Sequence, residues 1–268
     1  MELLSARETL IMDSMDWYNL PQYYDFIFDT ETQRDADFLE GVIEKYLDGK
    51  VERIFEPACG SGRLIRELAK RGHMLKGFDS NRSMLNFAVN STRRYSDKVS
   101  LTLANMDTFR FERTYDLAYC LINTFRYLST EDAARGHLRC VGNSLKPGGI
   151  YVLGLHLTDY SITRCERERT VRENKHLTVV CNIQSWPPDR KKRLQRFRAR
   201  MRVETPRRMR EYETAWMFRT YGPRQIRSLF DAAQDLECID TYGFDYELSC
   251  PHSMGGGRLD RVFILRRT

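Results

Sequence analysis

Strands and helices alternate along most of this 268-residue chain, and this alternation restricts the possible folds more than any other feature. Residues 117–122 form an almost continuous apolar run, which is typical of a strand buried on both faces. Apolar side chains at helical spacing predict helices at 32–47, 63–71, 129–145 and from 223. Short apolar or alternating segments predict strands, one ending at 54–55 and the others at 74–78, 99–103, 117–122, 150–155, 236–241 and 262–265. Repeated units of this kind predict an α/β fold with a doubly wound, mostly parallel sheet.

The basic excess of the chain is concentrated in residues 164–219, which hold 17 Lys and Arg against 7 Asp and Glu, although the whole chain has a net charge of only +6. In this segment apolar residues recur at every second position. Arg196, Arg198, Arg200 and Arg202 alternate with Phe197, Ala199, Met201 and Val203. This alternation, with further extended segments at 176–186 and 210–221, predicts an inserted antiparallel β meander laid over the main sheet.

A glycine loop links the first strand to its helix and reads Glu-Pro-Ala-Cys-Gly-Ser-Gly from Glu56 to Gly62. In a doubly wound sheet, a ligand meets the strand ends and a helix N-terminus at this position. A dinucleotide fingerprint would continue with Gly or Ala three residues after Gly62, where this chain has Ile65. Glu56 would repel a pyrophosphate, so the loop favours a ligand with a cationic end.

This combination resembles the class I S-adenosylmethionine-dependent methyltransferases, whose first motif is an acid, three residues and Gly-x-Gly. The resemblance extends to Asp79 after the second strand, where the family's acid binds the ribose hydroxyls, and to Asp107, where it meets the adenine amino group. It implies a Rossmann-like seven-stranded sheet with an antiparallel last strand, S-adenosylmethionine as cofactor and S-adenosylhomocysteine as product. The implied cofactor-binding residues are Glu56, Ala58, Cys59, Gly60, Ser61, Gly62, Asp79, Ser80, Met84, Asn105, Met106, Asp107, Leu121 and Asn123.

The expected organisation is a single methyltransferase domain over residues 1–268. Residues 1–50 would form an N-terminal helical cap, 51–160 and 221–268 the Rossmann-like core, and 161–220 an Arg-rich antiparallel lid. Cys59 is interpreted as a packing residue, and the loop with His252 and Gly255-Gly256-Gly257 as a connection between the last two strands.

The resemblance points to the small-molecule branch of the family. Its members often begin with a Tyr-Tyr-Asp segment, here Tyr23-Tyr24-Asp25, and often insert a lid after the fifth strand. The fourth strand ends in Asn123-Thr124-Phe125-Arg126, without the Pro-Pro-aromatic sequence of enzymes that methylate nucleobase or glutamine amino groups. We therefore expect in-line methyl transfer to a small molecule. His156, Tyr24 and Tyr221 are the candidate catalytic residues, and a base is needed only if the acceptor keeps its proton.

Two alternatives stay open. The arginine-rich insertion is also compatible with an RNA methyltransferase that uses it as a binding surface, or with a non-catalytic S-adenosylmethionine-binding protein. Nucleic acid is not the expected partner, because few stacking aromatics share a face with the arginines of residues 196–202. The same surface could join two copies as a homodimer.

Cysteine usage and hydropathy indicate the compartment. The seven cysteines are scattered without Cys-x-x-Cys spacing, so neither a disulfide framework nor a metal site is expected. No apolar run approaches the roughly 18 residues of a membrane helix. The first 20 residues carry acids where a signal peptide would carry a basic region. Together these features predict a cytoplasmic protein.

Overall fold

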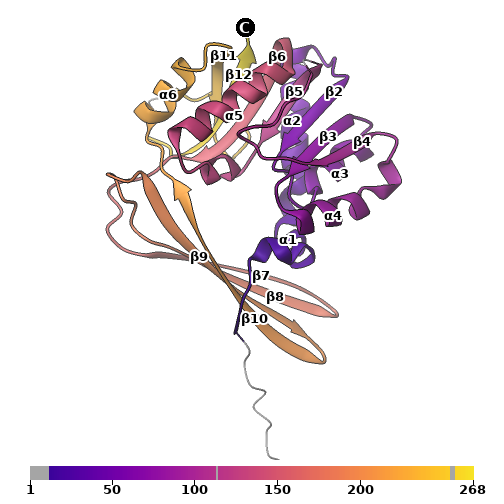
Figure 1. Cartoon of the computed structure of the whole chain (residues 1–268), viewed down its shortest axis with the longest axis vertical. Coiled ribbons are helices and arrows are strands. Elements are labelled where there is room, and N and C mark those ends of the chain that lie inside the picture. The colour runs from indigo at the N-terminus through magenta and orange to yellow at the C-terminus, as the bar shows by residue number, and fades with distance from the viewer. Residues whose placement is uncertain (1–11, 113, 254–256) are drawn as a thin grey trace, which may run out of the picture.

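The computed structural model describes residues 12–112, 114–253 and 257–268, which form two β-sheets and the helices around them (Figure 1). The larger sheet has seven strands in the order β11-β12-β6-β5-β2-β3-β4. These strands are β2 (Arg53–Pro57), β3 (Met74–Asp79), β4 (Val99–Leu103), β5 (Tyr115–Cys120), β6 (Leu145–His156), β11 (Leu236–Tyr242) and β12 (Asp260–Arg267). β2 to β6 run parallel, and β12 is antiparallel to both of its neighbours. The predicted seven-stranded sheet with an antiparallel last strand is confirmed.

Six helices lie in the part of the chain that the structure describes. They are α1 (Pro21–Phe28), α2 (Thr32–Leu47), α3 (Arg63–Lys70), α4 (Arg82–Ser91), α5 (Glu131–Ser144) and α6 (Pro223–Asp231), with short 3-10 turns η1 (Trp17–Asn19), η2 (Asp29–Glu31), η3 (Arg93–Tyr95) and η4 (Thr124–Tyr127). α2 and α3 pack on one face, and α5 and α6 pack on the other.

The apolar run of β5 is explained by this two-sided burial. Leu117 and Tyr119 point into the layer of α2 and α3, whereas Ala118 and Cys120 point into the layer of α5 and α6. All four are buried. A strand covered on both faces has no polar side, and its sequence therefore does not alternate.

The second sheet has five strands in the order β1-β10-β9-β8-β7. They are β1 (Met12–Ser14), β7 (Glu166–Asn174), β8 (Leu177–Ser185), β9 (Leu194–Thr205) and β10 (Arg208–Arg219). β7 to β10 are the expected antiparallel meander, and β1 from the N-terminal part of the chain adds a parallel edge strand to β10.

The prediction that this meander lies over the main sheet is wrong. Its apolar face, which includes Val179, Ala199 and Met201, packs instead against Trp17 of η1 and Ile27 of α1. Figure 1 shows α1 beside this sheet and next to the larger one. The N-terminal residues supply the apolar surface that the main sheet was expected to offer, and the molecule therefore has a separate third core cluster.

Within the part of the chain that the structure describes, no helix is both long and apolar enough to cross a membrane.

Candidate functional site

The glycine loop between β2 and α3 adopts the left-handed backbone that glycine favours. φ is +54° at Gly60 and +73° at Gly62. A Cβ on Gly62 would lie 3.0 Å from the Cβ of Ala88, whereas a Cβ on Gly60 would meet no protein atom within 4 Å. Gly62 is therefore needed for the packing of α3 against α4. Gly60 borders open space, where a ligand can approach the backbone.

Asp79, at the end of β3, holds this loop in place. One carboxylate oxygen accepts the Gly60 N–H at 2.8 Å, and the other accepts the Asn81 N–H at 2.7 Å. Burial raises the pKa of Asp79, although these backbone donors oppose the shift. Each oxygen keeps a lone pair that can accept a hydroxyl hydrogen bond.

Glu56, near the end of β2, is a partly buried acid, and one side-chain hydrogen bond to it is found among the described residues. The hydroxyl of the buried Tyr119 donates to it at 3.1 Å. Burial raises the pKa of Glu56 to about 8, and the positive charge of Arg63 only partly opposes this. The Arg63 guanidinium is itself bound to Asp35 at 2.7 Å. A cationic ligand beside Glu56 would supply the charge that favours its ionised form.

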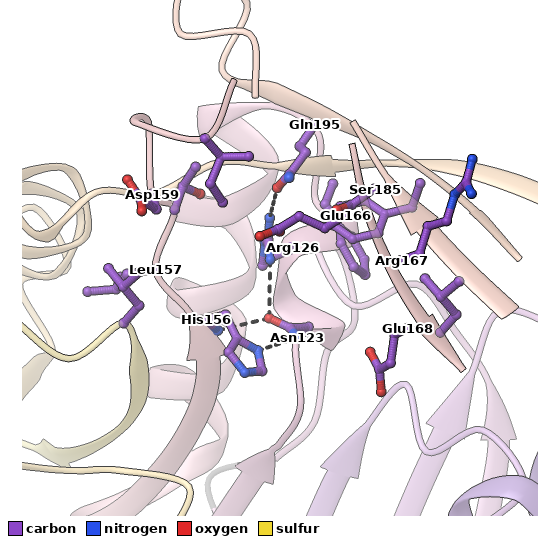
Figure 2. Close-up of a pocket in the computed structure, with 16 residues that line it drawn as sticks. Asn123, Arg126, His156, Leu157, Asp159, Glu166, Arg167, Glu168, Ser185 and Gln195 are labelled. Atoms are coloured by element: carbon purple, nitrogen blue, oxygen red, sulfur yellow. Dashed lines mark hydrogen bonds between the residues drawn. The ribbon is translucent and has the colours of Figure 1, made fainter. Parts of the chain in front are cut away.

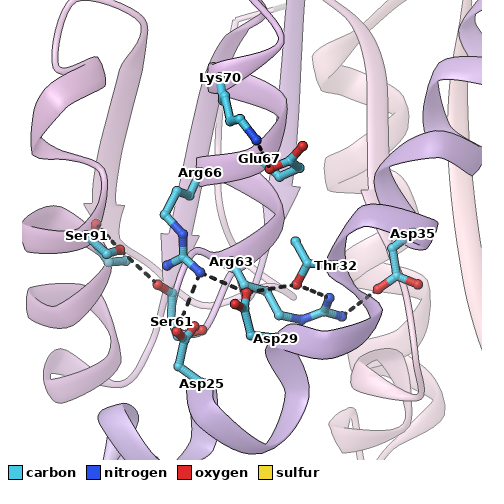
Figure 3. Close-up of polar contacts among 11 residues, drawn as sticks. Asp25, Asp29, Thr32, Asp35, Ser61, Arg63, Arg66, Glu67, Lys70 and Ser91 are labelled. Atoms are coloured by element: carbon cyan, nitrogen blue, oxygen red, sulfur yellow. Dashed lines mark hydrogen bonds and ion pairs between the residues drawn. The ribbon is translucent and has the colours of Figure 1, made fainter.

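The N-terminal helices are attached to the same loop region through ion pairs (Figure 3). Arg66 on α3 contacts Asp29 at 2.9 Å, and Arg63 also donates to the hydroxyl of Thr32 at 3.1 Å. Tyr24 on α1 lies close enough to feel the charges of Arg63 and Asp79. Burial, the largest effect, raises its pKa to about 12.

The loop after β4 carries Asn105, Met106 and Asp107, and α5 fixes it from behind. His137 bonds the Met106 carbonyl through Nδ1 and the Tyr151 hydroxyl through Nε2, both at 2.7 Å. Burial lowers the pKa of His137 to about 4, so the ring is neutral and donates from Nδ1. No motif in the sequence marks His137, because its partners are a backbone carbonyl and a residue of a distant strand.

The remaining predicted cofactor residues divide by exposure. Cys59, Ser61, Leu121 and Met84 are buried, so any contact of Cys59 or Ser61 with a ligand would run through the backbone. Ala58 has a positive φ of 52°. Ser80 follows Asp79 directly and is exposed. Gly255 and Gly256 lie outside the described residues.

The backbone after β5 is strained. Ile122 and Asn123 have φ of 54° and 67°, which side chains other than glycine rarely adopt. Such conformations persist where surrounding contacts hold them, and here the Asn123 N–H donates to the Gly154 carbonyl at 3.1 Å. The turn brings the Asn123 side chain next to the end of β6.

A cavity of about 500 Å³ lies between the end of β6 and the second sheet (Figure 2). Its walls combine polar side chains with aromatic rings. The lining residues include Asn123, Arg126, His156, Asp159, Glu166, Arg167, Glu168, Gln195, Phe197 and Phe218. The structure thus brings together the predicted residues Asn123 and His156, and adds Arg126 and Gln195, which no sequence motif marked.

Tyr221, which the sequence suggested as a candidate catalytic residue, is not among the residues that line this cavity. Tyr221 is fully buried, with its ring 5.7 Å from that of Phe125 and 5.3 and 5.8 Å from the guanidinium groups of Arg193 and Arg219. Tyr24 packs in the aromatic cluster of Trp17 and Phe28 and is not among the residues lining the cavity.

A hydrogen-bond network fixes the imidazole of His156. The Asn123 Oδ1 atom accepts both the His156 backbone N–H at 2.8 Å and an Arg126 N–H at 3.4 Å. The Asn123 amide nitrogen must therefore be the donor to His156 Nδ1, at 2.7 Å. The neutral ring then carries its proton on Nε2. Burial, and next the positive charge of Arg126, lower the pKa of His156, which favours this neutral form.

Comparison with known proteins shows which protein family the loop and strand-end residues resemble. A family model described as a methyltransferase domain matches residues 54–149, which span the glycine loop, Asp79, Asp107 and Asn123. Residues 54–149 of the chain are therefore similar to a methyltransferase domain.

Relatives of the methyltransferase domain are distant. A Geobacillus sp. (strain WCH70) protein named as a methyltransferase is 24% identical over 146 residues, which is 54% of this chain and 59% of that protein. The match therefore covers less than two thirds of the relative.

Solved structures share the fold over nearly the whole chain. An S-adenosylmethionine-dependent methyltransferase from Clostridium acetobutylicum has a TM-score of 0.75 at 18% identity, covering 94% of this chain and 99% of that one. CalS10 from Micromonospora echinaspora, an amino pentose methyltransferase solved with S-adenosylmethionine bound, has a TM-score of 0.70 at 20% identity, covering 96% and 100%. The second sheet thus lies within the part of the fold that these structures cover.

Proposed function

We propose that this protein transfers a methyl group from S-adenosylmethionine to a small molecule held in the cavity between β6 and the second sheet. The observation that carries the proposal is the position and size of that cavity. It opens at the carboxyl ends of the parallel strands and holds about 500 Å³, within the range of small-molecule sites.

The cofactor fits the other half of the same edge. The open space above Gly60 would let the cofactor approach the loop backbone, and Asp79 would accept hydrogen bonds from the two ribose hydroxyls. The loop from Asn105 to Asp107 would contact the adenine. Glu56 offers a carboxyl group for the cationic amino end. When bound, the sulfonium supplies an activated methyl group.

The protein's own residues position the acceptor and exclude water. The strained turn at Asn123 and the end of β6 form the floor of the cavity, and β7 to β10 form its roof. Because His156 is held as the Nε2–H tautomer, it acts as a hydrogen-bond donor that orients the acceptor, and not as the general base. An acceptor such as an amine, once neutral, needs no further base for in-line attack.

The proposal is tested in two steps. Calorimetry measures S-adenosylmethionine binding to the purified protein. Release of S-adenosylhomocysteine is then followed with a panel of small acceptors, beginning with amino sugars because CalS10 is an amino pentose methyltransferase. Cofactor binding with no turnover on any amine, hydroxyl or carbon acceptor would favour a non-catalytic binding protein. Absence of cofactor binding would refute the proposal.

A further inference from the structure

Arg126, on η4, is a buried cation without a carboxylate partner. Its residue is only 4% exposed. The guanidinium donates to the Arg219 carbonyl at 3.1 Å, to Asn123 Oδ1 at 3.4 Å and to Gln195 Oε1 at 3.1 Å. These three partners are neutral, and no Asp or Glu oxygen of the described residues lies within 4 Å of it.

Two neighbouring arginines, unlike Arg126, form ion pairs with a carboxylate. Arg219 and Arg193 both bind the carboxylate of Glu131 on α5, at 2.7 and 2.8 Å. One carboxylate thus pairs with two of the three arginines, whereas Arg126, the most buried of the three, has no counter-ion among the described residues. Burying an unpaired charge is costly, and the rings of Phe218 and Phe197, at 4.8 and 5.8 Å, compensate only in part.

The same corner of the cavity presents hydrogen-bond donors. A guanidinium has five N–H groups, of which the three bonds above use three, so two remain. The Asn123 amide oxygen is already occupied by two donors, and the His156 ring keeps its proton on Nε2. Arg126, Asn123 and His156 all line the cavity (Figure 2).

We propose that the corner formed by Asn123, Arg126 and His156 binds an oxyanion of the acceptor, a phosphate ester or a carboxylate. The proposal rests on the proposed function, because it takes this cavity as the acceptor site. An oxyanion here would balance the positive charge of Arg126 and accept charge-assisted hydrogen bonds from its two remaining N–H groups.

Strand β7 gives the acceptor a direction. Glu166, Arg167 and Glu168 all line the same cavity, and the two carboxylates outnumber the one guanidinium, so this strand disfavours a second anionic group. The acceptor that fits both this strand and the Arg126 corner therefore carries its oxyanion at one end and a neutral or cationic part toward β7. A simple hydrocarbon or a purely cationic amine would leave Arg126 unpaired.

The test uses inorganic phosphate and acetate as probes, on the full chain saturated with S-adenosylhomocysteine so that the cofactor half is filled. Calorimetric titrations are made at constant ionic strength, balanced with chloride. We expect saturable binding of at least one probe, and the stronger probe distinguishes a phosphate-ester acceptor from a carboxylate acceptor. Arg126→Gln should weaken it by about tenfold or more. Arg196→Gln, which removes an exposed arginine from the same sheet outside the cavity, should change it by less than about twofold.

A second variant covers the case in which Arg126→Gln does not fold. Gln195→Glu places a carboxylate 3.1 Å from the Arg126 guanidinium and supplies the missing counter-ion from within, at the expense of one hydrogen bond to the Trp186 carbonyl. It should remain folded and lose oxyanion binding. If the wild type binds neither probe, or if Gln195→Glu binds as the wild type does, Arg126 only joins η4 to the second sheet and the proposal is wrong. S-adenosylhomocysteine binding is measured in the same samples, so failure of the proposed function is seen separately.

Discussion

At the scale of single residues, Asp79 combines two tasks, because its carboxylate holds the Gly60 loop and faces the expected ribose. Asp79→Ala should weaken S-adenosylmethionine binding by roughly 1–3 kcal/mol, since two hydroxyls lose a charged acceptor. Calorimetry measures this. Asp79→Asn, which keeps one oxygen acceptor, should lose less. Unchanged affinity in Asp79→Ala would remove Asp79 from the cofactor site.

A substitution at Gly60 tests ligand contact, and a control at another glycine with positive φ separates this effect from backbone strain. Gly60→Val should abolish cofactor binding and leave a folded protein, because a Cβ at this position meets no protein atom within 4 Å and the side chain would enter the open space above the loop. Gly148→Val is the matched control, since Gly148 also has a positive φ, of 79°, and an unobstructed Cβ position, but lies in the turn at the start of β6. Circular dichroism and calorimetry compare the two. Unfolding of Gly60→Val alone would mean that the loop is primarily structural.

Glu56 predicts a pH dependence of stability. Its pKa is about 8 in the folded protein, above the usual carboxyl value, so the folded state keeps a proton that the unfolded state loses. Stability due to this group is complete below the unfolded pKa and falls as pH rises toward 8. Glu56→Gln should therefore raise the melting temperature of the ligand-free protein more at pH 8 than at pH 5, while weakening cofactor binding. An equal shift at both pH values would contradict the buried-acid explanation.

Sequence motifs located the residues around Gly60 because a tight loop after a strand needs particular residue types in consecutive order. Arg126 and His137 were not found for the opposite reason. Arg126 bonds Gln195 and the Arg219 carbonyl, and His137 bonds the Met106 carbonyl, all more than 30 residues away in the sequence. Contacts of this kind leave no local pattern, and only the folded structure reveals them.

At the scale of elements, β9 shows how the arginine-rich segment is accommodated. Ala199, Met201 and Val203 are buried, whereas Arg196 and Arg200 are exposed, so the predicted two-faced strand is confirmed. Acids of the same sheet pair with some of these arginines. Glu213 on β10 contacts Arg200 at 2.6 Å and Arg198 at 3.7 Å.

These ion pairs lower the positive potential available to phosphates, so we expect no selective nucleic-acid binding. At about 150 mM salt, RNA and DNA should bind only weakly and without preference, and Arg198→Glu with Arg200→Glu should change little. Filter binding or fluorescence anisotropy measures this. Tight, selective RNA binding that the double substitution removes would instead support an RNA methyltransferase.

The alternation of strands and helices predicted a mostly parallel sheet, and the resemblance to a known family implied its seven strands with an antiparallel last one. The place of the second sheet was not predictable. Val179 and Met201 require an apolar surface, but their spacing does not say which one. Trp17 supplies it, stacked 4.9 Å from Trp216 of β10.

At the scale of the whole molecule, the two sheets have separate apolar cores and are joined by polar contacts near the cavity. Glu131→Gln should lower the free energy of unfolding by about 1–3 kcal/mol, because the buried Arg219 loses its carboxylate. Asp132→Asn, in the same first turn of α5 but exposed, is the matched control. Hydrogen exchange should accelerate mainly in β7 to β10. Equal acceleration in the larger sheet would show that the two cores unfold together.

A homodimer through the second sheet stays a prediction. The exposed arginines of β9 are partly neutralised within the chain, so such an interface would have to add contacts of its own to those with Glu213.

The attachment of Trp17 to β10 also determines the order in which the chain can fold. The backbone N–H of Trp17 donates a hydrogen bond to the hydroxyl of Thr214, 197 residues further along the chain. During synthesis the segment from η1 to α1 therefore emerges early and waits, without this partner, until β10 has left the ribosome. The larger sheet also needs β11 and β12, which follow β10, so the second sheet has all its strands before the larger one does. Closing loops of this length is slow, and the aromatic residues of the N-terminal segment are the part most in need of a chaperone in the interval.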